Sequence, residues 1–266
     1  MRVYFIGAGP GASDLITLRG ANILGRVNMV LYAGSLVPTD MLHHCHPDAE
    51  LIDTAKLNLE QQEACYRRAQ ASNRDVARLH SGDPAIYGAT AEQMRRLDVL
   101  GIEYEVVPGV SSFSAAAAAV KAELTKPEVS QTIILTRVSG RASAVPETEA
   151  IAKLAGHRAT MCIFLSGPHL KKIVSDLRLH YPEDTPVVLV YRASWPEQRT
   201  YQGTLGTVLK ETKRSAWNLT TMLLVGAALG HGEQTESSLY SRDFKHLFRA
   251  VKKTKQKVGK IDKVMA

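Results

Sequence analysis

The sequence predicts an α/β protein, and three observations support this prediction. Strand-like and helix-like segments alternate along residues 1–112, as they do in chains that form a parallel sheet. A similar alternation resumes after residue 122. Three turns rich in glycine and proline follow strand-like segments, at residues 7–11, 81–84 and 108–112. Because the carboxyl ends of parallel strands share one edge of the sheet, we expect these turns to meet around a ligand.

In the first half of the chain, short apolar segments predict strands at 2–6, 28–32, 50–53, 75–80 and 103–107. Helices are expected between them, at 14–24, 59–71 and 90–100. Asp14 and Glu60 fall early in the first two, where a carboxylate stabilises the unpaired amides of a helix start. A further helix at 114–121 contains five consecutive alanines, a composition that lets backbones pack closely.

The second half predicts strands at 132–135, 159–164, 186–191 and 220–225, a short strand at 198–202, and helices at 170–179 and 205–211. We therefore expect two α/β domains, at 1–121 and 122–232, followed by a tail at 233–266. No low-complexity linker separates the two domains, so this boundary is compositional only.

Composition indicates a globular protein with a sizeable core, because 45% of the 266 residues are hydrophobic and the mean hydropathy is −0.11. No apolar segment approaches the roughly 20 residues that cross a bilayer. The N-terminus lacks the basic and apolar segments of a secretory signal. We expect a cytoplasmic protein with no membrane partner.

The net charge of +7 comes from the C-terminal end of the chain. Residues 242–266 hold nine Lys or Arg and two Asp, whereas the preceding 241 residues hold 24 basic and 24 acidic residues. A neutral core does not predict nucleic-acid binding. The basic end is expected to be a solvated tail.

The three cysteines, Cys45, Cys65 and Cys162, are far apart and predict neither a disulfide framework nor a zinc ribbon. His43, His44 and His46 flank Cys45, and on a helix His43 and His46 would share a face, as metal ligands can. No second group of ligands accompanies them, so no metal is predicted.

The first turn fits the dinucleotide-binding pattern at Gly7, Gly9 and Ala12, which suggests a nicotinamide dehydrogenase. Two details contradict that interpretation. No acidic residue occurs between Asp14 and Asp40, where the ribose-binding carboxylate should stand. Pro10 also removes an amide donor from the place where a pyrophosphate would bind.

The second turn, Gly82-Asp83-Pro84, is more specific. Pro84 holds Asp83 in an extended conformation, which leaves backbone groups free to face a ligand. Asp83 is interpreted as a cap or a ligand-positioning residue rather than a proton-transfer group. Ser111 or Ser112 is expected to cap the alanine helix. Without a nucleophile elbow, a zinc motif or a Walker lysine, the chain suits a reaction that needs mainly orientation, such as methyl transfer from a sulfonium.

Together the three turns resemble those of the tetrapyrrole (precorrin) methyltransferases. The segments that carry this resemblance are Gly7-Ala-Gly-Pro-Gly11, Arg78 to Gly88, and Val107 to Ser112. Residues 31–37 (LYAGSLV), 123–132 (ELTKPEVSQT) and 134–137 (ILTR) are similar to the branch that methylates C-11 of precorrin-4 or cobalt-precorrin-4 in cobalamin biosynthesis.

The resemblance implies a homodimer in which S-adenosylmethionine, the methyl donor, lies in a cleft between two α/β domains. The donor-binding residues that it implies are Pro10, Ser81, Gly82, Asp83, Ile86, Ser111, Ser112, Leu165, Ala193 and Thr221. Cations expected to bind the carboxylates of the tetrapyrrole are Lys126, Arg137, Arg141 and Arg192. No catalytic residue is implied, because the acceptor carbon is already rich in electrons.

Three positions depart from the family pattern. Ala12 replaces an Asp that would cap a helix, and Lys126 replaces an apolar residue. Ala33 stands where uroporphyrinogen-type relatives carry an Asp, which disfavours that substrate. Open alternatives are a methyltransferase of the same fold acting on another precorrin carbon, on a diphthamide precursor or on ribosomal RNA, and a non-catalytic protein that binds tetrapyrrole or S-adenosylmethionine. The RNA alternative would require a basic core, which is not found.

Overall fold

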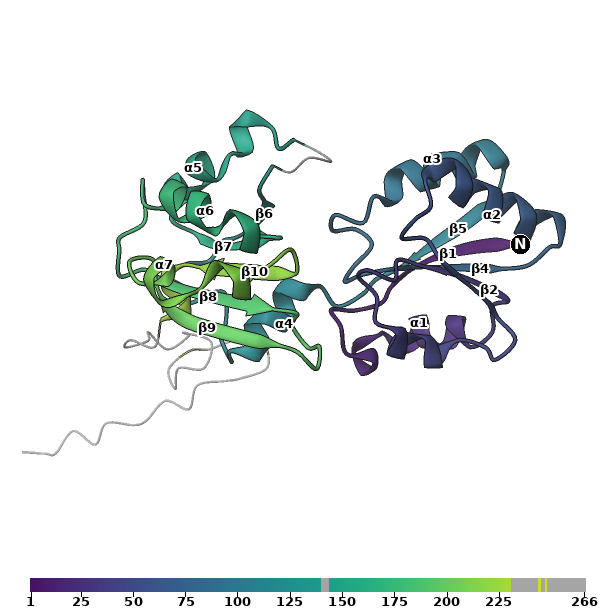
Figure 1. Cartoon of the computed structure of the whole chain (residues 1–266), viewed down its shortest axis with the longest axis horizontal. Coiled ribbons are helices and arrows are strands. Elements are labelled where there is room, and N and C mark those ends of the chain that lie inside the picture. Colours follow the sequence, from purple (N-terminus) through teal and green to yellow (C-terminus); the bar gives the residue numbers. More distant parts are fainter. Residues whose placement is uncertain (140–143, 231–243, 245–246, 248–266) are drawn as a thin grey trace, which may run out of the picture.

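The computed structural model describes residues 1–139, 144–230, 244 and 247. These residues form two α/β lobes, each built on one five-stranded sheet (Figure 1). Apart from Phe244 and Leu247, the basic tail expected at 233–266 lies outside the described residues. Within the described ranges, no helix is long and apolar enough to cross a lipid bilayer.

The first sheet is parallel, with the strand order β3-β2-β4-β1-β5. Its strands are β1 (Arg2–Gly7), β2 (Met29–Tyr32), β3 (Glu50–Asp53), β4 (Val76–His80) and β5 (Glu103–Val107). All five predicted strands are confirmed within a residue. Since β4 lies between β2 and β1, the order differs from the 3-2-1-4 order of a dinucleotide-binding fold. This sheet and its helices are called the N lobe below.

The helices of the N lobe are α1 (Leu18–Leu24), α2 (Leu59–Ala71) and α3 (Thr90–Leu100). The predictions at 59–71 and 90–100 are confirmed. The helix predicted at 14–24 is wrong in its first part, where a 3-10 turn, η1 (Ser13–Leu15), precedes α1. Thr17 caps α1 by accepting the amide of Gly20, so the helix begins after it.

Alternation along β1 decides which helix covers which face. Tyr4 and Ile6 pack into the core with α1, whereas Val3 and Phe5 pack on the other face with α2 and α3. Figure 1 shows α1 on one face of the sheet and α2 and α3 on the other. The loops at the sheet edge are therefore held by a core on both faces.

The second sheet has the order β6-β7-β10-β8-β9. Its strands are β6 (Ile133–Arg137), β7 (Thr160–Phe164), β8 (Pro186–Tyr191), β9 (Arg199–Thr204) and β10 (Thr221–Val225). The predicted strands are confirmed with shifts of one or two residues. Only the pair β6 and β7 is parallel, and the other pairs are antiparallel.

On one face of this sheet lie α5 (Ile151–Leu154), α6 (Leu170–Leu177) and α7 (Val208–Glu211). Both predicted helices are shorter than expected. The amide of Leu205 pairs with the Thr185 carbonyl and that of Gly206 with the Glu183 carbonyl, so α7 begins only after them. Further 3-10 helices are η2 (Thr39–His44), η3 (Glu147–Glu149), η4 (Ala155–His157), η5 (Gly167–His169), η6 (Arg214–Ala216) and η7 (Ala227–Leu229).

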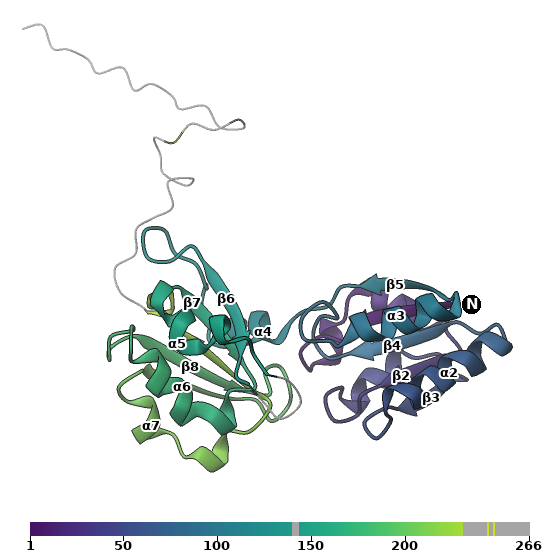
Figure 2. The ribbon, with the colours of Figure 1, turned by 90° about the horizontal axis from the view of Figure 1, so that it is seen from above.

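The alanine helix α4 (Ser112–Ala119) packs on the opposite face of the second sheet. Ala116 shares a core with Cys162, Val190 and Leu224. Figure 2 shows α4 beside the second sheet, reached by the chain that leaves β5. We call α4 together with the second sheet and its helices the C lobe. The limits 1–121 and 122–232 stay predictions of the sequence.

Candidate functional site

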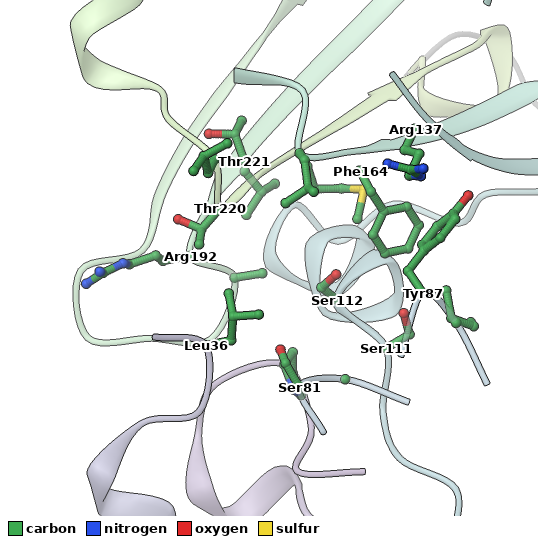
Figure 3. A pocket seen from close by; sticks show the side chains of 18 of the residues that line it. Leu36, Ser81, Tyr87, Ser111, Ser112, Arg137, Phe164, Arg192, Thr220 and Thr221 are labelled. Atoms are coloured by element: carbon green, nitrogen blue, oxygen red, sulfur yellow. The ribbon is translucent and has the colours of Figure 1, made fainter. Parts of the chain in front are cut away.

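A cavity of about 460 Å³ lies between the two lobes. The turns after β1, β4 and β5 form its N-lobe side, and residues at the ends of β7, β8 and β10 form its C-lobe side (Figure 3). All ten residues expected to bind the methyl donor line it: Pro10, Ser81, Gly82, Asp83, Ile86, Ser111, Ser112, Leu165, Ala193 and Thr221. Folding thus brings six separate segments to one cavity, and donor binding by these residues stays a prediction.

The three turns of the N lobe meet through glycines. Gly9 and Gly82 pair as an isolated bridge, with the Gly82 amide donating to the Gly9 carbonyl at 2.7 Å. A Cβ on Gly7 would lie 2.5 Å from the Cα of Gly109 and 2.6 Å from the carbonyl oxygen of Gly82. Real Cβ atoms do not approach backbone so closely, so the three turns pack only because these residues lack side chains.

Asp83 ties the second turn to the third. Its Oδ1 accepts the amide of Ala85 at 2.7 Å, and its Oδ2 accepts the amide of Gly109 at 2.9 Å. Both carboxylate oxygens are therefore occupied by backbone donors. This geometry agrees with the interpretation of Asp83 as a positioning residue, because each of its oxygens holds a backbone amide of a different turn.

Ser111 occupies the position before α4, but no side-chain hydrogen bond caps the helix there. The expectation that Ser111 or Ser112 caps the alanine helix is therefore wrong for Ser111, and α4 itself begins at Ser112. Both serines line the cavity instead. Their hydroxyls are available to a ligand rather than spent on the helix start.

Backbone strain collects around the cavity. Tyr87, Ala89, Leu165 and Arg192 line it and have φ angles of +55°, +50°, +53° and +48°. Residues with a Cβ seldom adopt this left-handed conformation, and it persists where the surrounding structure enforces it, often at binding sites.

Thr221 places an unpaired hydroxyl at the cavity wall. The residue is 1% exposed, and its Oγ1 has no hydrogen-bond partner among the described residues. Its carbonyl, by contrast, accepts from both the amide and the hydroxyl of Ser166, at 3.0 and 3.1 Å. A buried hydroxyl without a partner is unfavourable, which makes Thr221 Oγ1 a candidate hydrogen-bonding group for a ligand.

The loop after β8 joins the lobes. Trp195 Nε1 donates to the Pro10 carbonyl at 2.9 Å, and the Ala12 amide donates to Ser194 Oγ at 3.0 Å. A Cβ on Gly11 would overlap the Trp195 indole, whose Cγ would be 2.9 Å away. Ala12, where the family pattern has a capping Asp, thus uses its backbone amide to hold the C lobe.

At another side of the cavity, aromatic residues of both lobes meet (Figure 3). The rings of Tyr87 and Phe164 lie 5.1 Å apart in an edge-on arrangement, and the Arg137 guanidinium is 5.8 Å from the Tyr87 ring centre. Burial raises the pKa of Tyr87, so its phenol stays protonated near neutral pH. Arg192 lines the cavity far from this group, with its guanidinium 4.8 Å from the Trp195 ring.

Two of the four expected substrate cations, Arg137 and Arg192, line the cavity. Lys126 does not, because its Nζ donates to the Gly230 carbonyl at 2.5 Å. Arg141 lies outside the described residues. Substrate binding by any of the four stays a prediction.

The histidines around Cys45 serve local structure. His43 Nδ1 contacts the Asp40 carbonyl and His44 Nε2 contacts the Ser13 carbonyl, at 2.6 and 3.0 Å. In the part of the chain that is described, no three His, Cys, Asp or Glu side chains gather as metal ligands.

Sequence reasoning missed several cavity residues, among them Tyr87, Phe164, Trp195 and Thr220. Tyr87 lies inside the Arg78 to Gly88 segment and could have been found from it. Trp195 and Phe164 carry no local signal, because their roles depend on contacts between lobes.

Residues 2–209 match the family of Tetrapyrrole (Corrin/Porphyrin) Methylases. The chain is 48% identical over 249 residues to a precorrin-4 C(11)-methyltransferase of Pseudomonas aeruginosa, covering 94% of this chain and 99% of that protein. Among solved structures, a cobalt precorrin-4 methyltransferase described as a cobalamin biosynthetic enzyme has a TM-score of 0.82 and 42% identity, with 86% of this chain and 96% of that chain covered.

A uroporphyrin-III C-methyltransferase from Thermus thermophilus, complexed with S-adenosyl homocysteine, has a TM-score of 0.71 and 26% identity, with 86% of this chain and 98% of that chain covered. The fold and the sequence lead to the same assignment. This chain therefore belongs to the tetrapyrrole (corrin/porphyrin) methylases.

Proposed function

We propose that this protein transfers a methyl group from S-adenosylmethionine to C-11 of precorrin-4 or of cobalt-precorrin-4, a step of cobalamin biosynthesis. The observation that carries the proposal is the cavity between the lobes, where the three turns of the N lobe meet residues of the C lobe. The relative from P. aeruginosa, which is named for this reaction, aligns over 94% of the chain. The solved relative with a TM-score of 0.82 acts on the cobalt form by its title.

The residues present fit a methyl donor of the size and polarity of S-adenosylmethionine. A cavity of about 460 Å³ lies within the usual range of small-molecule sites, roughly 300–1,000 Å³. The unpaired hydroxyl of Thr221 and the hydroxyls of Ser111 and Ser112 offer hydrogen bonds to polar ligand groups. Apolar side chains such as Ile86 and Leu165 line the rest. Bound there, S-adenosylmethionine supplies a methyl group already activated by its sulfonium.

The chain's own contribution is orientation. The titratable side chains along the described cavity wall are Asp83, Tyr87, Arg137 and Arg192. Both oxygens of Asp83 accept backbone amides, the Tyr87 phenol is protonated near neutral pH, and the arginines are cations. None of these groups is set up as a general base. Holding donor and acceptor in line, away from water, accounts for large rate effects without one.

The substrate is a macrocycle edged by carboxylates, and the cavity offers cations on two sides. Arg137 lies beside Tyr87 and Phe164 (Figure 3), whereas the Arg192 guanidinium lies 4.8 Å from the Trp195 ring. Guanidinium groups bind carboxylates through two parallel hydrogen bonds, so we assign substrate carboxylates to these two arginines. The aromatic rings next to them suit the edge of a conjugated ring system.

The methyltransferase is expected to act as a homodimer in the cytoplasm. Light scattering coupled to size-exclusion chromatography tests the first expectation by giving the mass directly. A monomeric mass at micromolar concentration contradicts it.

Labelled S-adenosylmethionine tests the reaction. The purified protein is incubated with the methyl-labelled donor and precorrin-4, and in parallel with cobalt-precorrin-4, and the product is examined by NMR. Label at C-11 is expected with at least one of the two substrates. Label at a different carbon supports the alternative of another precorrin position, and binding of both ligands without transfer supports a non-catalytic binding protein. Either result overturns the proposal.

A further inference from the structure

A group of buried polar side chains lies beneath loop 81–89, the N-lobe wall of the cavity. Arg78 and His80 belong to β4 and are each 6% exposed, Gln93 belongs to the first turn of α3 and is 4% exposed, and Tyr66 belongs to α2 and is 1% exposed. None of the four lines the cavity. Methyl transfer as described above therefore uses none of them directly.

Gln93 connects this group to the loop. Its Oε1 accepts from Arg78 Nε at 3.2 Å and from the Tyr66 hydroxyl at 3.1 Å, and its Nε2 donates to the Ala89 carbonyl at 3.2 Å. A guanidinium can only donate and a carbonyl can only accept, so the amide has one possible orientation. The side chain is thus fixed at both ends.

Arg78 makes that orientation obligatory. No carboxylate pairs with it in the described part of the chain, and the acceptors of its guanidinium are Gln93 Oε1 and the Leu79 carbonyl, the latter at 3.3 Å. A buried charge without such acceptors is strongly unfavourable. Turning the Gln93 amide over would place its N–H groups against the cation.

The loop above needs anchors of this kind. Tyr87 and Ala89 both have left-handed backbones, which are costly for residues with a Cβ. Hydrogen bonds that hold the end of this segment run from Gln93 Nε2 to the Ala89 carbonyl and from Thr90 Oγ1 to the Pro84 carbonyl, both at 3.2 Å. Strained backbone persists only when its surroundings impose it.

We propose that Gln93 is a positioning residue, which Arg78 and Tyr66 hold in place so that it fixes Ala89 and shapes loop 81–89 for the methyl donor. The same loop carries Ser81, Asp83 and Ile86 to the cavity. Gln93 therefore acts on the ligand only through backbone that it orders. This inference rests on the proposed function only in taking S-adenosylmethionine as the ligand.

Gln93→Glu separates positioning from simple stability. The carboxylate keeps acceptor oxygens for Arg78 and Tyr66, and the adjacent cation keeps it ionised, but it has no N–H for the Ala89 carbonyl. Tyr181→Phe is the matched control. This variant removes a buried hydrogen bond of 2.5 Å from the Tyr181 hydroxyl to the Ala159 carbonyl. Ala159 directly precedes β7, at the end of the strand that lies away from the cavity.

Two measurements are made on the full-length proteins: calorimetric binding of S-adenosylhomocysteine, and hydrogen exchange of amides 85–89 without ligand. For Gln93→Glu we expect faster exchange of these amides and binding weaker by about five- to tenfold, the loss of one neutral hydrogen bond. Tyr181→Phe should be less stable to urea but unchanged in both measurements. Gln93→Met, which keeps the chain length, serves if the glutamate variant does not fold.

If the wild-type protein does not bind S-adenosylhomocysteine, the proposed function is refuted. The role of Gln93 is decided even then, because the exchange of amides 85–89 is measured without ligand. Unchanged exchange in Gln93→Glu overturns the inference, whatever the affinity. If neither Gln93 variant folds, Gln93 belongs to the core rather than to the loop, and the inference is overturned as well.

Discussion

Replacing Gly109 with alanine should damage the cavity while leaving the protein folded. A Cβ at this position would lie 2.6 Å from the Cα of Gly7 and still closer to the carbonyl oxygen of Gly82. Both neighbours are backbone atoms of the other two turns, so no side-chain rotation can relieve the overlap. The turns must move apart.

The size of the effect follows from this geometry. Inserting a carbon into a well-packed site costs about 1–3 kcal/mol, which is below the roughly 5–15 kcal/mol that stabilises a typical protein. The variant should therefore fold. In the wild type the Gly109 amide donates to Asp83 Oδ2 at 2.9 Å. Moving the third turn away lengthens this hydrogen bond and so loosens the second turn. We expect the affinity for S-adenosylhomocysteine to fall by at least about tenfold, equivalent to roughly 1.4 kcal/mol.

The assay is calorimetric titration with S-adenosylhomocysteine alongside urea denaturation, with Gly101→Ala as the control. Gly101 ends α3 with a φ of +64°, and a Cβ there meets no atom within 4 Å. Alanine at 101 therefore costs about 1 kcal/mol of backbone strain without steric overlap, far from the cavity. The reasoning is refuted if Gly109→Ala binds the ligand as tightly as Gly101→Ala does.

Three further predictions concern the cavity wall and the buried histidine. Thr221→Val removes an unpaired buried hydroxyl, so the free energy of unfolding should stay equal or rise. Calorimetry should show S-adenosylhomocysteine binding that is about fivefold weaker. An unchanged affinity would show that the hydroxyl contacts no ligand. Trp195→Phe loses the bond to the Pro10 carbonyl between the lobes and should raise the KM for S-adenosylmethionine more than it lowers kcat, and a change in kcat alone would contradict this. Burial lowers the pKa of His80 from 6.5 to about 3, so the folded protein keeps it neutral while the unfolded chain takes up a proton. The stability that the neutral His80 contributes is complete above about pH 6.5 and declines as the pH falls toward 3, by about 2 kcal/mol at pH 5. Urea denaturation at pH 7 and pH 5 should therefore show that His80→Gln loses less free energy of unfolding between these pH values than the wild type does. Equal losses would contradict the prediction.

Local pattern was enough to predict the strands, the helices 59–71 and 90–100, and the three turns of the N lobe. Asn58 and Gln61, for example, form a capping box within four residues, so the start of α2 depends on its own sequence. The helix predicted at 14–24 failed because Thr17 caps a later start. Strand direction in the second sheet was not predictable, since it depends on which strands pair.

The cavity could be predicted in part. All ten residues derived from the resemblance reach the cavity, and those of the N lobe come from turns whose glycines and serines leave a signal in the sequence. Trp195 and Phe164 leave none. The role of Trp195 depends on its hydrogen bond to the Pro10 carbonyl, which forms only when the two lobes pack.

The sequence by itself determined the elements and the turns, because hydrogen bonds and side-chain alternation within a few residues decide them. Only the tertiary structure decided the cavity between the lobes. The bonds from Trp195 to Pro10 and from Ala12 to Ser194 join residues 185 and 182 positions apart, and the strained loop 81–89 depends on buried groups of β4 and α3 beneath it. Contacts of this range exist only after both lobes have packed, so their residues carry no local pattern from which they could be predicted.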